Sequence, residues 1–250
     1  MFSIFIMIYT INLMPKIRLF CNESLEEKKE INIDGDNFHY LVNVMRCEVG
    51  SVVFLFNEND GEFYTKVSSK LKRGLKLTIH ERKEYEKIDN DFSIIFCPPK
   101  SNKLDILIQK CTEIGVKNFV PVISQHTENR SLNINRMKKI ILEAVEQSNQ
   151  IYIPNICNPV NLTKFIDEFD SENNEIFFAD IQSDISISNL KIDNKKSNFI
   201  LIGPEGDFSP SELKILRDSF QSFTIGKRIL RSETAAISSL ILFNNIKVIN

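Results

Sequence analysis

Apolar segments of strand length alternate with segments of helical spacing from Phe92 onward, and this alternation constrains the fold more than any other feature. Residues 92–96 form a short apolar run, which is typical of a buried strand. Residues 104–114 then keep apolar side chains at helical spacing until Gly115 ends the helix. The same pattern predicts strands at 119–123, 176–179, 199–202 and 223–225, and helices at 135–148 and 234–248. Because strand–helix alternation produces a mostly parallel sheet covered by helices, we predict an α/β domain.

The preceding segment has a different period and predicts a smaller domain. Apolar and polar residues alternate there with period two, which is typical of half-buried strands, and Asp36 is expected to cap a helix at 38–46. Strands are predicted at 17–20, 31–33, 51–56, 62–67 and 75–80. Several short strands around one helix indicate a β-barrel-like domain. We therefore predict a β domain at 14–88 and an α/β domain at 89–250, joined by the charged stretch 81–91.

Residues 1–13 are largely apolar, yet they are too short for a membrane span, which takes about 20 residues. They also lack the basic start and small-residue cleavage site of an export signal. Met14-Pro15-Lys16 has the character of an ordinary amino terminus. We interpret residues 1–13 as a non-native or disordered extension that precedes a working start at Met14.

Charge and cysteine content exclude several classes of protein. Lys and Arg number 31 against 33 Asp and Glu, a net charge of −2, which argues against a protein that coats nucleic acid. The five cysteines form no C-x-x-C pair, and with only three histidines no metal site is expected. Free thiols are typical of a reducing cytosol, so we expect a cytoplasmic protein with no membrane partner.

A basic run in the β domain allows two interpretations. No acid occurs between Glu62 and Glu81, whereas five cations do. The run is either a solvated hairpin edge, which lysines commonly protect from pairing, or a face that binds RNA phosphates. The five cations are Lys66, Lys70, Lys72, Arg73 and Lys76.

Two segments follow strands of the predicted parallel sheet, where such sheets bind ligands. In the first, Gly203 and Gly206 flank Pro204-Glu205 and allow close approach of the backbone to a ligand. No phosphate-binding P-loop or dinucleotide fingerprint is present. The second segment, 225–235, places three cations before a helix start, where the helix dipole favours anions. A capping box at Ser209-Pro210-Ser211-Glu212 predicts another helix start.

Four stretches now carry a resemblance to a known family. They are Gln109-Lys110-Cys111-Thr112-Glu113-Ile114-Gly115-Val116, Glu143-Ala144-Val145-Glu146-Gln147-Ser148, Ile202-Gly203-Pro204-Glu205-Gly206 and Ile225-Gly226-Lys227-Arg228-Ile229-Leu230-Arg231-Ser232-Glu233-Thr234-Ala235. Through these motifs the chain resembles the SPOUT-class RNA methyltransferases, specifically the bacterial ribosomal small subunit methyltransferase E family. The resemblance covers residues 14–250.

This resemblance implies a PUA-like RNA-binding β-barrel followed by a trefoil-knotted parallel-sheet domain. It also implies a homodimer that takes S-adenosylmethionine as cofactor and methylates N3 of a uridine in 16S rRNA of the small (30S) ribosomal subunit. Two alternatives remain. One is a methyltransferase of the same class acting on a ribose 2′-hydroxyl or on tRNA, and the other is a non-catalytic RNA-binding protein.

The chemistry of methyl transfer, considered beside the resemblance, indicates candidate site residues. Arg231 is the candidate stabiliser of the uridine anion, and Glu205 is a weaker candidate for proton acceptor, because a carboxylate that merely holds the loop is favoured. Arg228 and the basic run, Lys66 to Lys76, are expected to contact RNA. The residues expected to contact the cofactor are Ile202, Gly203, Pro204, Glu205, Gly206, Ile225, Gly226, Ile229 and Leu230.

Four residues at three places depart from the family pattern. Asp207 replaces the last glycine of the loop, so it is open whether the backbone there adopts the angle that the family's glycine allows. Gln150 stands where the family has arginine, and Gln125-His126 replaces an expected Glu-Arg. Two cations are thereby lost, unless Arg130 and Lys138 substitute for them.

Overall fold

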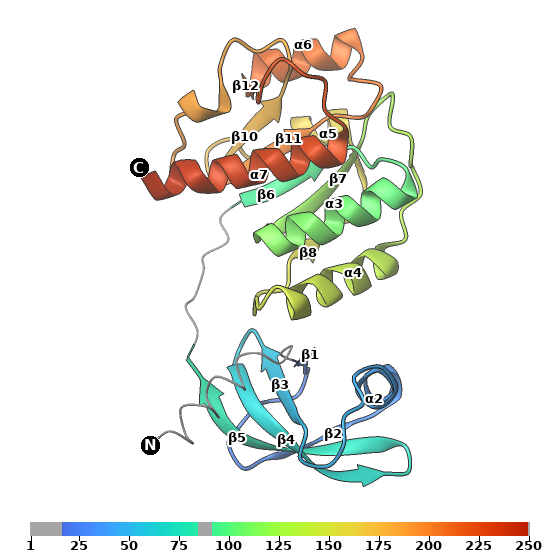
Figure 1. Cartoon of the computed structure of the whole chain (residues 1–250). Helices are drawn as coiled ribbons and strands as arrows, with labels where there is room; N and C mark the ends of the chain where they lie inside the picture. Colours follow the sequence, from blue (N-terminus) through green and yellow to red (C-terminus); the bar gives the residue numbers. More distant parts are fainter. Residues whose placement is uncertain (1–16, 85–91, 250) are drawn as a thin grey trace. The chain divides into compact units, whose positions relative to one another are not determined.

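The computed structural model describes residues 17–84 and 92–249, and the chain divides into two compact units, Met1–Lys87 and Ile88–Asn250 (Figure 1). The first unit is a curled five-stranded sheet in the order β1-β3-β4-β5-β2. β1 pairs with β3 in parallel, and the other pairs are antiparallel. The strands are β1 (Arg18–Phe20), β2 (Glu30–Ile33), β3 (Val52–Asn57), β4 (Gly61–Leu71) and β5 (Gly74–Lys83).

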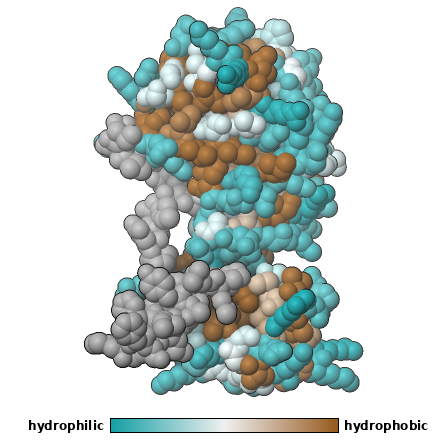
Figure 2. All heavy atoms as spheres, viewed as in Figure 1, coloured by the Kyte–Doolittle hydropathy of each residue, from teal (hydrophilic) through white to brown (hydrophobic). Residues whose placement is uncertain are grey.

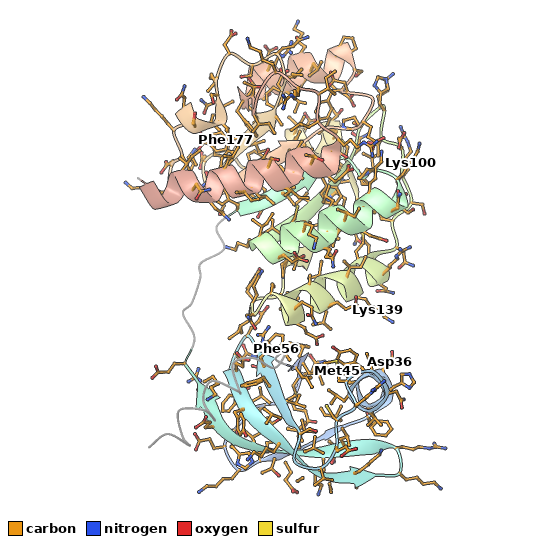
Figure 3. The ribbon with its side chains drawn as sticks, in the orientation of Figure 1. Asp36, Met45, Phe56, Lys100, Lys139 and Phe177 are labelled. Atoms are coloured by element: carbon orange, nitrogen blue, oxygen red, sulfur yellow. The ribbon has the colours of Figure 1, made fainter. Side chains whose placement is uncertain are left out.

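Sequence alternation places one face of this sheet against a core. Leu55 of β3, Val67 of β4 and Leu77 of β5 are buried together, and Met45 packs against the same cluster (Figure 3). Two register shifts between β4 and β5 interrupt the regular pairing, and such bulges bend a strand. The sheet therefore curls around its core, as the predicted β-barrel-like domain requires.

The helix of the first unit begins earlier than predicted. Asp36 does not cap it, because the carbonyl of Asp34 already accepts a helical hydrogen bond at 3.1 Å. The helix α2 (Gly35–His39) therefore begins before Asp36 and continues as a π-helical turn, Tyr40–Val44. It ends before Arg46, which adopts a positive φ of 55°.

The second unit is a parallel sheet between helices, which confirms the predicted α/β class. Its main strand order is β12-β10-β11-β6-β7-β8, β9 pairs with β7, and every one of these pairs is parallel. The strands are β6 (Phe92–Phe96), β7 (Asn118–Ile123), β8 (Asn155–Ile156), β9 (Val160–Asn161), β10 (Asn174–Ala179), β11 (Ser197–Ile202) and β12 (Gln221–Phe223). The helices are α3 (Ser101–Ile114), α4 (Ile134–Gln147), α5 (Leu162–Asp167), α6 (Pro210–Ser219) and α7 (Ser232–Ile249), with a 3₁₀ turn at Ile187–Asn189.

Helices cover both faces of the parallel sheet, with α3, α4 and α7 on one side and α5 and α6 on the other (Figure 1). Successive strand residues point to opposite faces of the sheet, so two neighbouring phenylalanines of β10 pack on different faces. Phe178 packs with Leu162 of α5 and Leu216 of α6. Phe177 instead lies 5.3 Å, between ring centroids, from Phe243 of α7. Both faces are therefore buried, which explains the continuous apolar strands in the sequence.

Local signals in this unit are largely confirmed. Gly115 ends α3 in the left-handed conformation, with φ of 97°, and Ser209 and Glu212 form the predicted capping box of α6. One strand is shifted, because the backbone N–H of Thr224 donates to Ile185 at 2.8 Å and leaves the sheet. The strand predicted at 223–225 is therefore β12, Gln221–Phe223. The short elements α5, β8 and β9 were not predicted.

Among the described helices, none has both the length and the apolar character needed to cross a membrane.

Candidate cofactor and RNA sites

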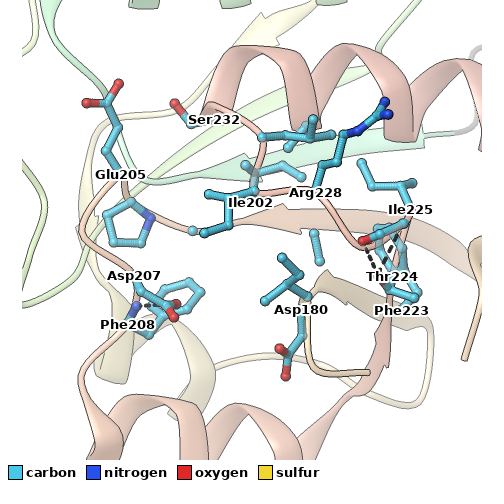
Figure 4. A pocket seen from close by; sticks show the side chains of 18 of the residues that line it. Asp180, Ile202, Glu205, Asp207, Phe208, Phe223, Thr224, Ile225, Arg228 and Ser232 are labelled. Atoms are coloured by element: carbon cyan, nitrogen blue, oxygen red, sulfur yellow. Dashed lines mark hydrogen bonds between the residues drawn. The ribbon is translucent and has the colours of Figure 1, made fainter. Parts of the chain in front are cut away.

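Three adjacent strands, β11, β10 and β12, end at the same edge of the parallel sheet, and a cavity of about 440 Å³ lies there (Figure 4). The loops after β11 and β12 supply much of its lining, and Asp180 after β10 adds to it. Apolar side chains such as Phe208 and Phe223 form part of the wall. All nine residues expected to contact the cofactor line this one cavity.

The first loop packs tightly beneath the cavity at Gly203. A Cβ atom on Gly203 would lie 2.7 Å from Cε2 of Phe208, closer than real Cβ contacts come. Phe208 is only 5% exposed and packs with Leu201 and Leu216. At Gly206 the nearest atom to such a Cβ is Cβ of His126, at an ordinary 3.6 Å. The structure therefore requires glycine at Gly203 and tolerates a methyl group at Gly206.

The backbone conformation at Asp207 explains how this residue can replace the family's glycine. It has φ of 61°, in the left-handed region that normally favours glycine. Aspartate is among the few other residues that tolerate this region, and its Oδ1 accepts a hydrogen bond from the N–H of Phe208 at 2.7 Å. The loop thus keeps a glycine-like backbone with a different residue.

His126 and Gln150, two more departures, make local bonds. Nδ1 of His126 lies 2.9 Å from the carbonyl oxygen of Asp207 and ties the loop after β7 to the loop after β11. The amide of Gln150 donates to the carbonyls of Thr112 and Glu113 at the end of α3, at 2.6 and 3.1 Å. Gln150 therefore satisfies helix-end carbonyls, a task that needs no positive charge.

Glu205 is held by a lysine from another element. Nζ of Lys103, in the first turn of α3, donates to Oε1 of Glu205. Both side chains are mostly shielded, with 20% and 22% of their surface exposed. In Figure 4 the carboxylate of Glu205 points away from Ile202, out of the cavity. This geometry favours a carboxylate that holds the loop.

The second loop separates the two arginines that the sequence singled out. Arg228 lines the cavity, although its guanidinium is directed outward in Figure 4. Arg231 is exposed and lies outside the cavity lining, where its carbonyl accepts the first helical hydrogen bond of α7 from Ala235, at 2.8 Å. Ile229 is 91% exposed at the cavity mouth. The loop thus presents both cations toward solvent next to the cavity.

Asp180 is a cavity residue that sequence reasoning missed. Its Oδ2 accepts hydrogen bonds from Nε and Nη2 of Arg217, at 2.9 and 2.7 Å, and its Oδ1 accepts one from the N–H of Gln182. Its position directly after a predicted strand was the available signal. The order of the strands, which sets β10 between β11 and β12, was not readable from the sequence.

The predicted basic run forms the β4–β5 hairpin of the first unit, which extends beyond the other strands in Figure 1. Two of its cations have neighbours: Lys76 pairs with Glu30 at 3.0 Å, and Nζ of Lys66 lies 5.7 Å from the centroid of the Tyr64 ring. The other three are exposed at or beside the hairpin turn, and no ion pair to a described residue is found for them. They are Lys70, Lys72 and Arg73.

Thiol and metal chemistry have no support among the described residues. Burial raises the pKa of the Cys97 thiol to about 11 and also raises the pKa of Cys111, so both remain protonated near neutral pH. Within residues 17–84 and 92–249, no group of three or more His, Cys, Asp or Glu side chains is arranged to hold a metal ion.

Comparison with known families defines the class of protein. The sequence model of a family described as the RNA methyltransferase domain matches residues 86–244. A second family model, described as the RNA methyltransferase PUA domain, matches residues 33–79. Fold, cavity and both matches therefore define a two-domain RNA methyltransferase.

Full-length relatives identify the family within this class. Ribosomal RNA small subunit methyltransferase E of Rickettsia conorii is 30% identical over 229 residues, which cover 89% of this chain and 93% of the relative. The enzyme of the same name from Mesomycoplasma hyopneumoniae is 30% identical over 223 residues, 86% and 88% of the two chains. The chain belongs to the ribosomal RNA small subunit methyltransferase E family, which confirms the resemblance seen in its motifs.

Solved structures share the fold. A ribosomal RNA small subunit methyltransferase E from Neisseria gonorrhoeae, bound to S-adenosyl methionine, aligns with a TM-score of 0.82 at 24% identity and covers 92% of this chain and 98% of its own. A methyltransferase from Legionella pneumophila, also in complex with this cofactor, aligns with a TM-score of 0.81 at 23% identity, with coverage of 93% and 98%.

Proposed function

We propose that this chain transfers a methyl group from S-adenosylmethionine to N3 of a uridine in 16S rRNA of the small ribosomal subunit. The observation that carries the proposal is the cavity where the loops after β11 and β12 meet. Its volume of about 440 Å³ falls in the range of roughly 300–1,000 Å³ typical of ligand sites. Relatives named ribosomal RNA small subunit methyltransferase E, which align over 89% and 86% of this chain, support the same assignment.

The residues present fit this cofactor. Apolar walls from Ile202, Phe208 and Ile225 suit an adenine ring, and the glycine-containing turn 203–206 allows close approach of the backbone. The neighbouring carboxylate of Glu205 is already paired with Lys103. When bound, S-adenosylmethionine would supply an activated methyl group on a positively charged sulfur.

The chain's own residues account for the remaining steps. Holding donor and base in line supplies much of the rate, and the packed loops at the cavity are suited to that task. N3 of uridine must lose its proton, and Arg231 at the start of α7 is our candidate to stabilise the resulting anion. The target base must also leave its stack to reach the cavity. Glu205 remains a weaker candidate for the proton, because Lys103 occupies its carboxylate.

The test is methylation of 30S subunits and, in a parallel reaction, of tRNA by the purified chain, with mass mapping of the modified nucleotide. We expect one methyl group on a uridine base. A methyl group on a ribose, or on tRNA, would favour the alternative enzyme of the same class. Calorimetry showing no binding of S-adenosylmethionine would favour the non-catalytic RNA-binding protein.

We expect the hairpin cations to bind rRNA phosphates. Replacing Lys70, Lys72 and Arg73 together with serine should weaken binding of a 16S rRNA fragment. It should also reduce the slope of log affinity against log salt by about two to three, because each lost phosphate contact removes roughly 0.7–0.9. Lys76→Ser is the control and should change the slope less, since Lys76 already pairs with Glu30. Equal salt slopes for the triple variant and the wild type would contradict a phosphate-binding role.

We also expect a homodimer. Ile241 and Leu242 of α7 are 45% and 38% exposed, and hydrophobic residues gather on the face along which α7 runs (Figure 2). Burial against a second copy would remove this surface from water. Light scattering at micromolar concentration should give about twice 28.9 kDa, and a mass of 28.9 kDa would contradict the dimer. A trefoil knot and a cytoplasmic location belong to the same proposal.

A further inference from the structure

We propose that Lys103 is a positioning residue for the cofactor, because its ammonium group fixes the turn 203–206 through the carboxylate of Glu205. The proposal rests on the proposed function, since it takes this turn to contact S-adenosylmethionine. It assigns a role in cofactor binding to a helix that contributes no residue to the cavity lining.

The pair joins two distant elements. Lys103 lies in the first turn of α3, and Glu205 follows β11, 102 residues later. α3 is anchored in the core by Leu104 and Leu107, which are buried. The ammonium group of Lys103 is therefore attached to a rigid helix. Its bond to Glu205 restricts the motion of the turn 203–206.

Partial burial makes this pair more effective than an ordinary surface pair. Its side chains are 20% and 22% exposed, whereas those of Lys164 and Glu168 on α5 are 65% and 67% exposed. Exposed pairs contribute little because water and salt screen them, while shielded pairs are screened less.

The turn needs an external attachment. Gly203 and Gly206 have no side chains, so they cannot anchor the turn themselves. Beyond it, the carbonyl of Asp207 meets Nδ1 of His126 at 2.9 Å. Within the turn, Glu205 makes the side-chain bond to another element. Because Glu205 points away from the cavity, the pair acts by fixing the backbone and not by touching the ligand (Figure 4).

Lys103→Met tests this role, because it keeps the aliphatic stem and removes the charge. We expect the dissociation constant for S-adenosylmethionine, measured by calorimetry, to rise about tenfold. The methylation rate at saturating cofactor should change less than about twofold, because uniform binding affects KM and not kcat. Lys103→Arg should restore most of the affinity, and the thermal midpoint should stay close to that of the wild type.

A double-mutant cycle shows whether the two side chains act together. Lys103→Met combined with Glu205→Gln should bind no more weakly than the weaker single variant. The exchanged pair, Lys103→Glu with Glu205→Lys, should recover part of the affinity. The control is Lys110→Met on the same helix, whose partner Glu113 is also in α3, and it should leave affinity unchanged.

Each outcome decides the proposal. Unchanged affinity in Lys103→Met, or fully additive effects in the cycle, would overturn the positioning role and leave the proposed function intact. A fall in thermal stability that accounts for the loss of affinity, with no rescue by Lys103→Arg, would also overturn it. A wild-type chain that binds no S-adenosylmethionine would overturn both proposals.

Discussion

Gly203→Ala is expected to weaken binding of S-adenosylmethionine by about 10- to 100-fold. The added Cβ would lie 2.7 Å from Cε2 and 3.2 Å from Cδ2 of Phe208, so either the ring or the turn must move. The ring is only 5% exposed and packs with Leu201 and Leu216, and because it also forms part of the cavity wall, moving it would change the shape of the cavity. Overpacking of this kind costs about 1–3 kcal/mol. If the turn moves in the free chain to relieve that strain, returning it to the binding geometry restores the cost, and every 1.4 kcal/mol is tenfold in affinity.

Gly206→Ala is the matched control for this prediction. It adds the same methyl group to the same turn, but its nearest neighbour would be Cβ of His126 at 3.6 Å. Its affinity should remain within about threefold of the wild type. Calorimetry gives the affinities, and thermal unfolding separates a local shift of the turn from general destabilisation. Equal losses in both variants would show that close packing beneath Gly203 does not govern cofactor binding.

Features set by near neighbours in the sequence were predictable. Gly115 and the Ser209–Glu212 capping box act within a few residues, and both appear as expected. The predicted start of α2 was wrong, because the carbonyl of Asp34 accepts a helical hydrogen bond and the helix therefore begins before Asp36. The predicted end of β12 was wrong, because the backbone N–H of Thr224 donates to Ile185 in a distant loop. Contacts between distant segments leave no local pattern to read.

The candidate site shows the same division. The two glycine-containing loops could be found because each directly follows an apolar strand, and the structure places them on one cavity. Asp180 was missed because its place beside them depends on strand order. Lys103 was missed because its partner, Glu205, lies 102 residues away. The sequence therefore predicts which loops form the cavity and not which side chains hold them.

Arg231→Ala is expected to lower the rate of methylation by about 10²- to 10³-fold, by analogy with loss of a donor to a developing anion. Arg231 is exposed at the start of α7 and lies outside the cavity lining, so affinity for S-adenosylmethionine should change little. The planar, multiply donating fork of a guanidinium suits the uridine anion. Arg231→Lys should therefore rescue poorly, because a point charge does not reproduce that fork.

Arg228→Ala provides the contrast, because Arg228 lines the cavity three residues earlier. Its loss should weaken binding of the cofactor or of RNA, with a smaller effect on the rate once both are saturating. Single-turnover methylation of 30S subunits, with calorimetry of the donor, separates the two arginines. Normal methylation by the Arg231→Ala variant would remove Arg231 from the mechanism. A collapse of donor binding in that variant would instead make Arg231 a cofactor residue, because stabilising the anion helps only in the transition state.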